Sequence, residues 1–249
     1  MLSIAKITFR EAIRDRILYT ILIFGILFAL LTLFLAQLTV GDLAMVRSFG
    51  LAGIYIFGMI ITIFLGSSVV YREIEKKTLY FVLSKPISRG RVIVGKFLGL
   101  LFAVALTTIC MALIYLFIIA YEGGGIDVLG LVSILLQILE ETLFIAMLIL
   151  FSSFSTPLIS TISSLLLLFV GHLLDTVVKS AEQIGGAIHQ IFLYASYILP
   201  NLEKFNIRNL VIHDIGISFE TLLVIIGYTI LYIFIFLISA EAIFKKREL

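Results

Sequence analysis

The sequence predicts an all-α integral membrane protein with six transmembrane helices. Hydrophobic residues make up 61% of the 249 residues and charged residues 14%, well below the roughly 25% charge that soluble domains carry. The mean hydropathy is +1.21. Apolar runs recur along the chain, and about 20 apolar residues are enough to cross a bilayer as a helix. This composition excludes a soluble globular protein and leaves room for about six spans joined by short loops.

We interpret the whole chain, residues 1–249, as one transmembrane domain. Its first part, residues 1–16, alternates apolar and basic side chains, which is typical of an amphipathic helix lying in the membrane surface. The alternative is a basic flank that only orients the chain. The other parts are residues 17–71 with spans 1 and 2, 72–91 with a charged segment, 92–178 with spans 3 to 5, 179–217 as an outer re-entrant hairpin, and 218–249 with span 6 and a basic tail.

Turn-forming residues separate the predicted spans. Glycines in the second span let helices approach closely. The three glycines at 123–125 end the third span, and SSFSTP at 152–157 forms the turn before the fifth. The six spans are Ile17–Leu38, Phe49–Tyr71, Val92–Ala120, Val128–Phe151, Pro157–Val178 and Ser218–Phe244.

The long charged run from Tyr71 to Lys96 holds seven of the eighteen Lys and Arg residues. No Pro or Gly interrupts Arg72 to Ser84, apolar residues recur there on one side, and Pro86 can stop a helix. Basic clusters beside apolar spans mark the cytoplasmic side of a membrane. We therefore expect a short amphipathic helix along the inner membrane face between spans 2 and 3.

Between spans 5 and 6, Ala187 to Leu199 is apolar over only thirteen residues, and Pro200 follows. A run this short favours a re-entrant or interfacial helix over a span. The basic residues support the same topology, with both termini in the cytoplasm, because fourteen fall on predicted inner segments and four on outer ones. A seventh span, or one span fewer, would place the basic carboxy terminus outside. The four outer basic residues are Arg47, Lys179, Lys204 and Arg208.

Two adjacent acids, Glu140 and Glu141, lie in the middle of the fourth span. A carboxylate inside the membrane is costly, so it is expected to be functional or paired. In the functional interpretation, the two acids line a substrate path or the seam of a dimer. In the alternative, one of them is protonated and bonded to a neighbouring Ser, Thr or Gln. The sequence leaves both interpretations open.

GRVIVGKF, residues 90–97, has the spacing of a phosphate-binding loop, but Phe97 stands where that motif needs Ser or Thr for magnesium. We therefore expect no ATP binding by this chain and interpret Gly95 and Gly99 as a helix-packing notch. The single Cys110 excludes a cysteine cage, and the histidines match no compact metal motif. We predict no metal site, no catalytic residue and no enzymatic activity. The histidines, interpreted as packing or surface residues, are His172, His189 and His213.

A recognisable pattern runs through the charged segment and the start of span 3: Glu73, Thr78, Leu79, Leu83, Ser84, Pro86 to Arg89, Gly95 and Lys96. It resembles the segment after the second span of ABC-2 type permeases, the membrane subunits of one class of exporters. The likeness is strongest to permeases for multicopper enzyme maturation, including that of nitrous oxide reductase. It also covers the amino-terminal helix, the Glu in the fourth span, the Ser-rich turn and LPNLEKFN at 199–206.

The resemblance implies that Arg72 to Pro86 is a coupling helix seated in a groove of a separate ATPase subunit. It implies a permease homodimer with two ATPase subunits, which bind the ATP and Mg²⁺, and an outer hairpin from Val178 to Asn209 that gates the exit. The alternative is a solvated loop that only orients the chain. The residues expected at the ATPase are Arg72, Glu73, Glu75, Lys76, Lys77, Thr78, Leu79, Phe81, Val82 and Pro86, with Ser153 and Ser155 in a smaller second contact.

We therefore expect the permease subunit of an ATP-driven exporter in the cytoplasmic membrane, with no cofactor of its own. Its expected partners are two ATPase subunits, a second copy of itself and the lipid bilayer, with room for a separate periplasmic accessory protein and with no nucleic acid. The competing interpretation is an ATP-independent carrier or channel. Carriers usually show internal repeats, and the charged segment after span 2 has no counterpart after span 5.

Overall fold

The computed structural model describes residues 1–14, 16–38, 43–67 and 88–246. Every regular element in these ranges is a helix, which confirms the predicted all-α class. The expected coupling helix, Arg72 to Pro86, lies outside the described residues together with all of its expected contact residues. The described helices are α1 (Leu2–Arg14), α2 (Arg16–Leu38), α3 (Leu43–Gly66), α6 (Arg89–Tyr121), α7 (Val128–Ser152), α8 (Pro157–Ile184), α9 (Gly186–Ile198), η1 (Glu203–Phe205), α10 (Arg208–Ile212) and α11 (Phe219–Lys246).

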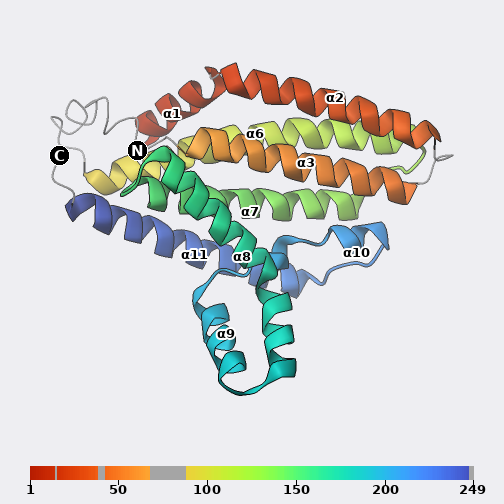
Figure 1. Cartoon of the computed structure of the whole chain (residues 1–249). Coiled ribbons are helices and arrows are strands. Elements are labelled where there is room, and N and C mark those ends of the chain that lie inside the picture. The colour runs from red at the N-terminus through yellow and green to blue at the C-terminus, as the bar shows by residue number, and fades with distance from the viewer. Residues whose placement is uncertain (15, 39–42, 68–87, 247–249) are drawn as a thin grey trace.

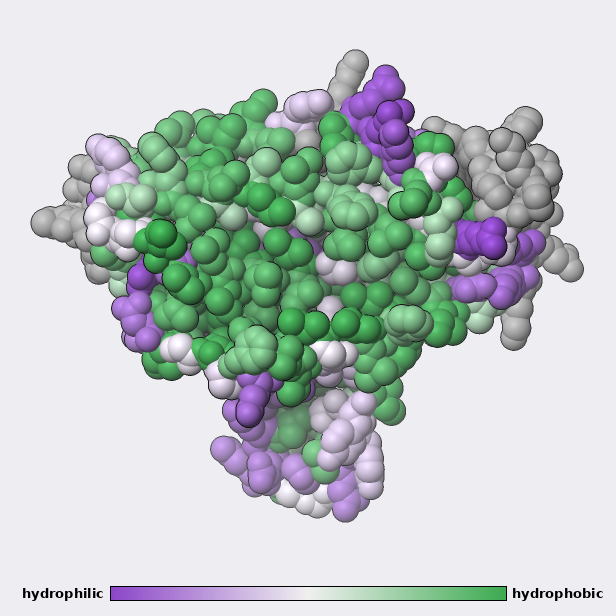
Figure 2. Space-filling model, turned by 180° about the vertical axis from the view of Figure 1, so that it is seen from behind, coloured by the Kyte–Doolittle hydropathy of each residue, from purple (hydrophilic) through white to green (hydrophobic). Residues whose placement is uncertain are grey.

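Five of the described helices are long and apolar enough to cross a membrane, namely α3, α6, α7, α8 and α11. They lie where spans 2 to 6 are predicted. At the position of the first predicted span, α2 is a helix of 23 residues that packs against α3. A broad apolar surface covers the bundle, and hydrophilic residues gather toward its ends and on a projecting hairpin (Figure 2). The chain is thus a multi-pass membrane protein, and the first of the six expected spans, at α2, stays a prediction.

Two helices extend by about six residues beyond their predicted spans. α3 begins at Leu43 rather than Phe49, because Arg47, expected in a loop, is paired with Asp127 inside the fold. α8 continues past Val178 to Ile184, since its polar last turns contain no helix breaker before Gly185, which has a φ of 75°. The apolar runs therefore located the spans, while a paired Arg47 lengthened α3 and the lack of a helix breaker lengthened α8.

α7 forms the centre of the bundle and packs against α3, α6, α8 and α11 (Figure 1). Every residue from Leu143 to Ile149 is at most 1% exposed. α8 and α11 lie at the periphery, with far more exposed apolar side chains. Because so little of α7 reaches lipid, a polar side chain on this helix faces another part of the protein.

α1 packs against α6 at Gly95 and Gly99, which confirms the predicted packing notch. A Cβ atom at Gly95 would lie 2.8 Å from the Cβ of Ile4, and one at Gly99 would lie 2.6 Å from that of Thr8. Both distances are shorter than real carbon contacts, so only glycine permits this approach. Residues 90–97 are part of α6 and form no loop.

We expect Gly99→Leu to detach α1 from α6. The added side chain would collide with Thr8 and with the carbonyl oxygen of Ala5, and overpacking of this kind costs about 1–3 kcal/mol. Thermal unfolding in detergent measures the loss. The matched control is Gly227→Leu in α11, where no atom lies within 4 Å of the added Cβ. Equal stability of the two variants would contradict the notch.

The chain between α8 and α11 has two parts with opposite surroundings. α9 contains no buried residue and packs mainly against α8, so the two helices form a hairpin that projects sideways from the bundle (Figure 1). Residues 200–212, the re-entrant segment, enter the bundle instead, and Leu202, Phe205 and Val211 are at most 2% exposed. The backbone N–H of Leu202 donates to the carbonyl of Gly171 in α8 at 3.1 Å. The sequence pointed to Ala187–Leu199 as the re-entrant or interfacial helix. In the structure the segment that enters the bundle comes after it, at residues 200–212.

Candidate functional site

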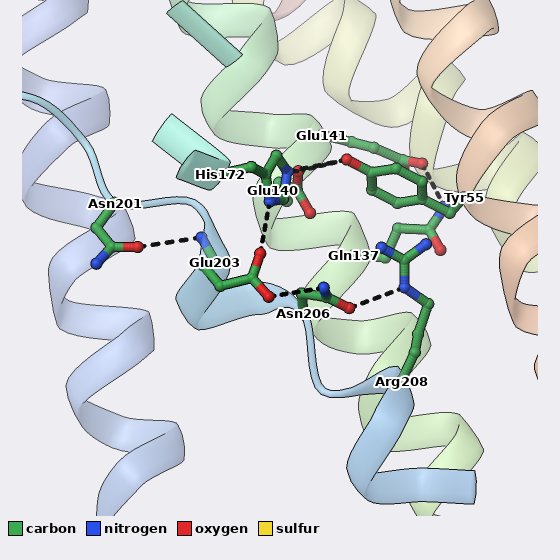
Figure 3. A network of polar contacts seen from close by, with 9 residues as sticks. All are labelled: Tyr55, Gln137, Glu140, Glu141, His172, Asn201, Glu203, Asn206 and Arg208. Carbon is green, nitrogen blue, oxygen red and sulfur yellow. Dashed lines mark hydrogen bonds and ion pairs between the residues drawn. The ribbon is translucent and has the colours of Figure 1, made fainter. Parts of the chain in front are cut away.

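A network of polar side chains lies inside the bundle, where α3, α7, α8 and the re-entrant segment meet (Figure 3). At its centre are Glu140 and Glu141, which are 2% and 0% exposed. The two acids lie near the middle of the 25-residue helix α7. Their side chains reach different partners, so each acid has its own surroundings.

Glu140 joins three helices at one carboxylate oxygen. The Tyr55 hydroxyl of α3 donates to Oε1 of Glu140 at 3.1 Å, and Nε2 of His172 in α8 lies 2.8 Å from the same oxygen. The Tyr55 oxygen is also 3.0 Å from this nitrogen. Each residue lies near the middle of its helix, and the three helices are therefore linked at about half their length.

The second ring nitrogen of His172 continues the network to the re-entrant segment. Its Nδ1 lies 3.1 Å from Oε2 of Glu203. The amide of Asn206 donates to the other oxygen of Glu203 at 2.9 Å, and Nε of Arg208 donates to the oxygen of Asn206 at 2.9 Å. The guanidinium of Arg208 then lies 4.0 Å from the centre of the Tyr55 ring, within cation–π distance. The contacts thus form a closed ring that starts and ends at Tyr55 and passes through both the helices and the re-entrant segment.

Asn201 fixes the start of the re-entrant segment. Its side-chain nitrogen donates to the carboxylate of Asp175 in α8. Its side-chain oxygen accepts the backbone N–H of Glu203 at 3.1 Å. These bonds position Glu203, and through it they position the network.

Both ring nitrogens of His172 lie close to a carboxylate oxygen, and a neutral imidazole has only one N–H to donate. A close contact between a ring nitrogen and a carboxylate oxygen needs a proton between them, and His172 makes such a contact at both nitrogens. Neutral imidazole carries one N–H, whereas the imidazolium ion carries two. The imidazolium form of His172 would satisfy both contacts at once.

Glu141 lies on the other side and links α7 to α3 and α6. It accepts the Gln137 amide and the Thr108 hydroxyl, each at 2.8 Å. Gln137 also donates to the carbonyl of Ile54 in α3 at 3.0 Å. A Cβ at Gly58 would collide with the carboxylate of Glu141 and with Gln137, so this glycine makes room for the contacts. Glu141 thus has the Thr and Gln partners of the paired interpretation.

A second polar cluster lies where α3 and α7 begin. Arg47 lies 3.3 Å from the carboxylate of Asp127 and 2.6 Å from that of Asp214, which follows α10. The Tyr115 hydroxyl of α6 donates to Asp127 at 2.6 Å, and Asp127 caps α7 by accepting the N–H of Gly130 at 2.9 Å. This cluster holds the far end of the re-entrant segment to the bundle.

Ser153 and Ser155, the serines expected at a second ATPase contact, hydrogen-bond to backbone carbonyls at the end of α7. The Ser153 hydroxyl donates to the carbonyl of Ile149 at 2.7 Å, and that of Ser155 donates to the carbonyl of Phe151 at 2.6 Å. Ser153 is fully buried, whereas Phe154 between them is 49% exposed. The exposed part of this turn is therefore aromatic.

Sequence reasoning identified the two acids of α7 and missed most of their partners. The sequence did contain one signal for the contact between Glu140 and His172. Both residues lie inside adjacent predicted spans, and ionisable residues inside the membrane tend to pair. His172, interpreted from the sequence as a packing or surface residue, links the two halves of the network. The described residues contain no group of three or more His, Cys, Asp or Glu that could hold a metal ion. The missed residues are Tyr55, His172, Asn201, Glu203, Asn206 and Arg208.

Long apolar helices around a buried polar network define a polytopic membrane protein. The chain belongs to the ABC-2 transporter family, because the family model described as ABC-2 family transporter protein matches residues 2–249. Members of this family are membrane permease components of ABC transporters, work with an ABC ATPase partner and are typically non-catalytic. Among curated proteins, none gives a significant match.

Proposed function

We propose that this chain is the permease subunit of an ATP-driven exporter in the cytoplasmic membrane. Two copies form a homodimer that carries two copies of a separate ATPase subunit, and ATP and Mg²⁺ bind there. Each copy has six spans, and both termini are cytoplasmic. The observation that carries the transport role is the link from Glu140 through His172 to Glu203, because it ties the buried centre of α7 to the re-entrant segment.

ATP-driven movement would enter through Arg72 to Pro86. The flanking helices support this assignment, since α3 ends and α6 begins at the end of the bundle where α1 begins and α11 ends (Figure 1). The charge distribution supports a cytoplasmic location for that end. An amphipathic helix can place its apolar face in a groove while its charged residues bond at the rim. Phe154, exposed at the end of α7, would replace the two serines in the smaller contact.

The re-entrant segment would act as the outer gate. It is held near its start by the Glu203 contact to His172 and beyond its end by the Asp214 contact to Arg47. Both contacts bridge to helices of the bundle, namely α8 and α3. A shift of these helices relative to each other would break one contact and release the segment. The polar network would then open toward the outer side.

The resemblance to permeases for multicopper enzyme maturation suggests a narrower role. In such a system the permease would pass a small species, or transmit force, to an extracytoplasmic accessory protein. The hairpin of α8 and α9 is the described part that could meet such a partner, because it projects beyond the bundle and contains no buried residue in α9.

Co-purification with the ATPase subunit encoded nearest to this chain tests the proposal. We expect a complex of two permeases and two ATPases that hydrolyses ATP in lipid nanodiscs. Loss of the ATPase during purification, even with nucleotide trapped, would contradict the coupled-transporter proposal and favour a carrier or channel. If the ATPase stays bound but the complex does not hydrolyse ATP, the ATP-driven cycle is contradicted, while the partnership with the ATPase is not.

A further inference from the structure

An apolar groove of about 550 Å³ lies between α1 and α6, away from the polar network. Its α6 wall is formed mainly by Phe102, Leu106 and Ile109, which are 44–58% exposed. These residues recur at helical spacing and form one stripe along α6. The α1 wall includes Ala5 and Phe9. The groove is therefore a long apolar depression beside an amphipathic helix.

The notch described above determines where the groove starts. Gly95 and Gly99 bring α1 against α6 at the level of Ile4 and Thr8. Beyond Gly99, Phe102 begins the α6 wall of the groove. The groove thus opens at the notch and continues toward the middle of α6, which is the direction of the bilayer centre.

A positive charge lies at the start of the groove. Lys6 is in its lining and neighbours Ala5, which meets Gly99. Arg10 and Arg14 follow Lys6 at four-residue spacing, so the three basic residues share one side of α1. All three are exposed, and no described acid lies within ion-pair distance of them. Of the three, Lys6 lies in the lining, so one basic side chain borders the apolar groove and two more continue along α1.

We propose that this groove binds one anionic phospholipid of the inner leaflet. An acyl chain would lie along Phe102, Leu106 and Ile109, and the phosphate would pair with Lys6. Long basic side chains at a membrane surface extend toward headgroups, and anionic lipids attract them. Charge distinguishes this occupant from a second copy of the chain, whose facing surface would carry the same basic row. The inference depends on the proposed orientation of α1 and is independent of coupling to an ATPase.

Native mass spectrometry of the purified chain tests the site with two probes of identical acyl chains, phosphatidylglycerol and phosphatidylcholine. We expect one phosphatidylglycerol to be retained per chain at concentrations where phosphatidylcholine is not. Lys6→Gln should weaken phosphatidylglycerol retention about fivefold, as expected for the loss of one charge near an anionic lipid. Leu106→Trp should fill the groove and abolish the retention of phosphatidylglycerol.

Leu113→Trp is the matched control, because Leu113 is exposed on the same side of α6 two turns beyond Leu106 and outside the groove. Lys179→Gln controls for charge, since Lys179 is exposed on α8 far from α1 in sequence. Neither control should change lipid retention. Equal retention of the two lipids by the unmodified chain, or unchanged retention in Leu106→Trp, would overturn the proposal. A loss of dimer in Leu106→Trp with lipid retention intact would instead assign the groove to a second copy.

Discussion

Replacing Glu140 and Glu141 together with glutamine is expected to slow ATP-driven transport on the order of tenfold or more, while the complex still assembles. The amide side chains keep hydrogen-bonding capacity, so Tyr55 and Thr108 retain partners. The charge that draws His172 toward Glu140 is lost. A coupling between two sites is typically worth 5- to 150-fold. ATP-driven transport in proteoliposomes measures the first effect, and size-exclusion chromatography of the complex measures assembly.

The controls for this double variant are Glu182→Gln and Glu220→Gln, which change the same chemistry at exposed positions. Normal transport by the double variant would show that the two acids are structural. A double-mutant cycle of Glu140→Gln with His172→Gln isolates their contact, and residues in one such network show interaction energies of about 0.5–3 kcal/mol. A value near zero would exclude the His172 contact from the gate.

Replacing Glu73 with lysine is expected to uncouple the ATPase while the permease stays folded. A like charge placed in a complementary interface costs several kcal/mol, which corresponds to more than a tenfold loss of ATPase binding. Phe81→Ala should act in the same direction by removing an apolar anchor. Binding of the purified ATPase and its stimulation by the permease are the measurements.

The matched control for this charge reversal is Glu182→Lys. Glu182 is exposed at the end of α8, on the outer side of the proposed topology, where no ATPase can bind. It should leave ATPase binding and stimulation unchanged. If Glu73→Lys and Phe81→Ala also leave both unchanged, the segment from Arg72 to Pro86 is not the coupling helix.

The positions of the helices could be predicted from the sequence because each is set by local signals. Pro157 starts α8 at its predicted residue, and the glycines after Tyr121 end α6. The packing of α1 on α6 was also accessible, because two glycines four residues apart create a notch whatever the partner. In each case the determining residues are close together in the chain.

The polar network could not be predicted because its contacts join residues far apart in sequence. Tyr55 and Glu140 are separated by 85 positions, and Tyr55 and His172 by 117. Their meeting depends on which helices are neighbours and on how they are rotated. The re-entrant segment adds a further difficulty, since Glu203 and Arg208 have the composition of a surface loop. The packing of apolar residues such as Leu202 and Phe205 carries that loop into the bundle.

The burial of Glu141 also bears on how the chain enters the membrane during synthesis. A helix that carries two carboxylates at its centre inserts poorly by itself, because an acidic residue there costs about 2.5–3.5 kcal/mol. The partners of Glu141 in α3 and α6, Gly58 and Thr108, are synthesised before α7 emerges. His172 and Glu203, which complete the surroundings of Glu140, come later. α7 is therefore expected to wait beside α3 and α6 at the insertion site, and its release into the bilayer should follow the synthesis of α8.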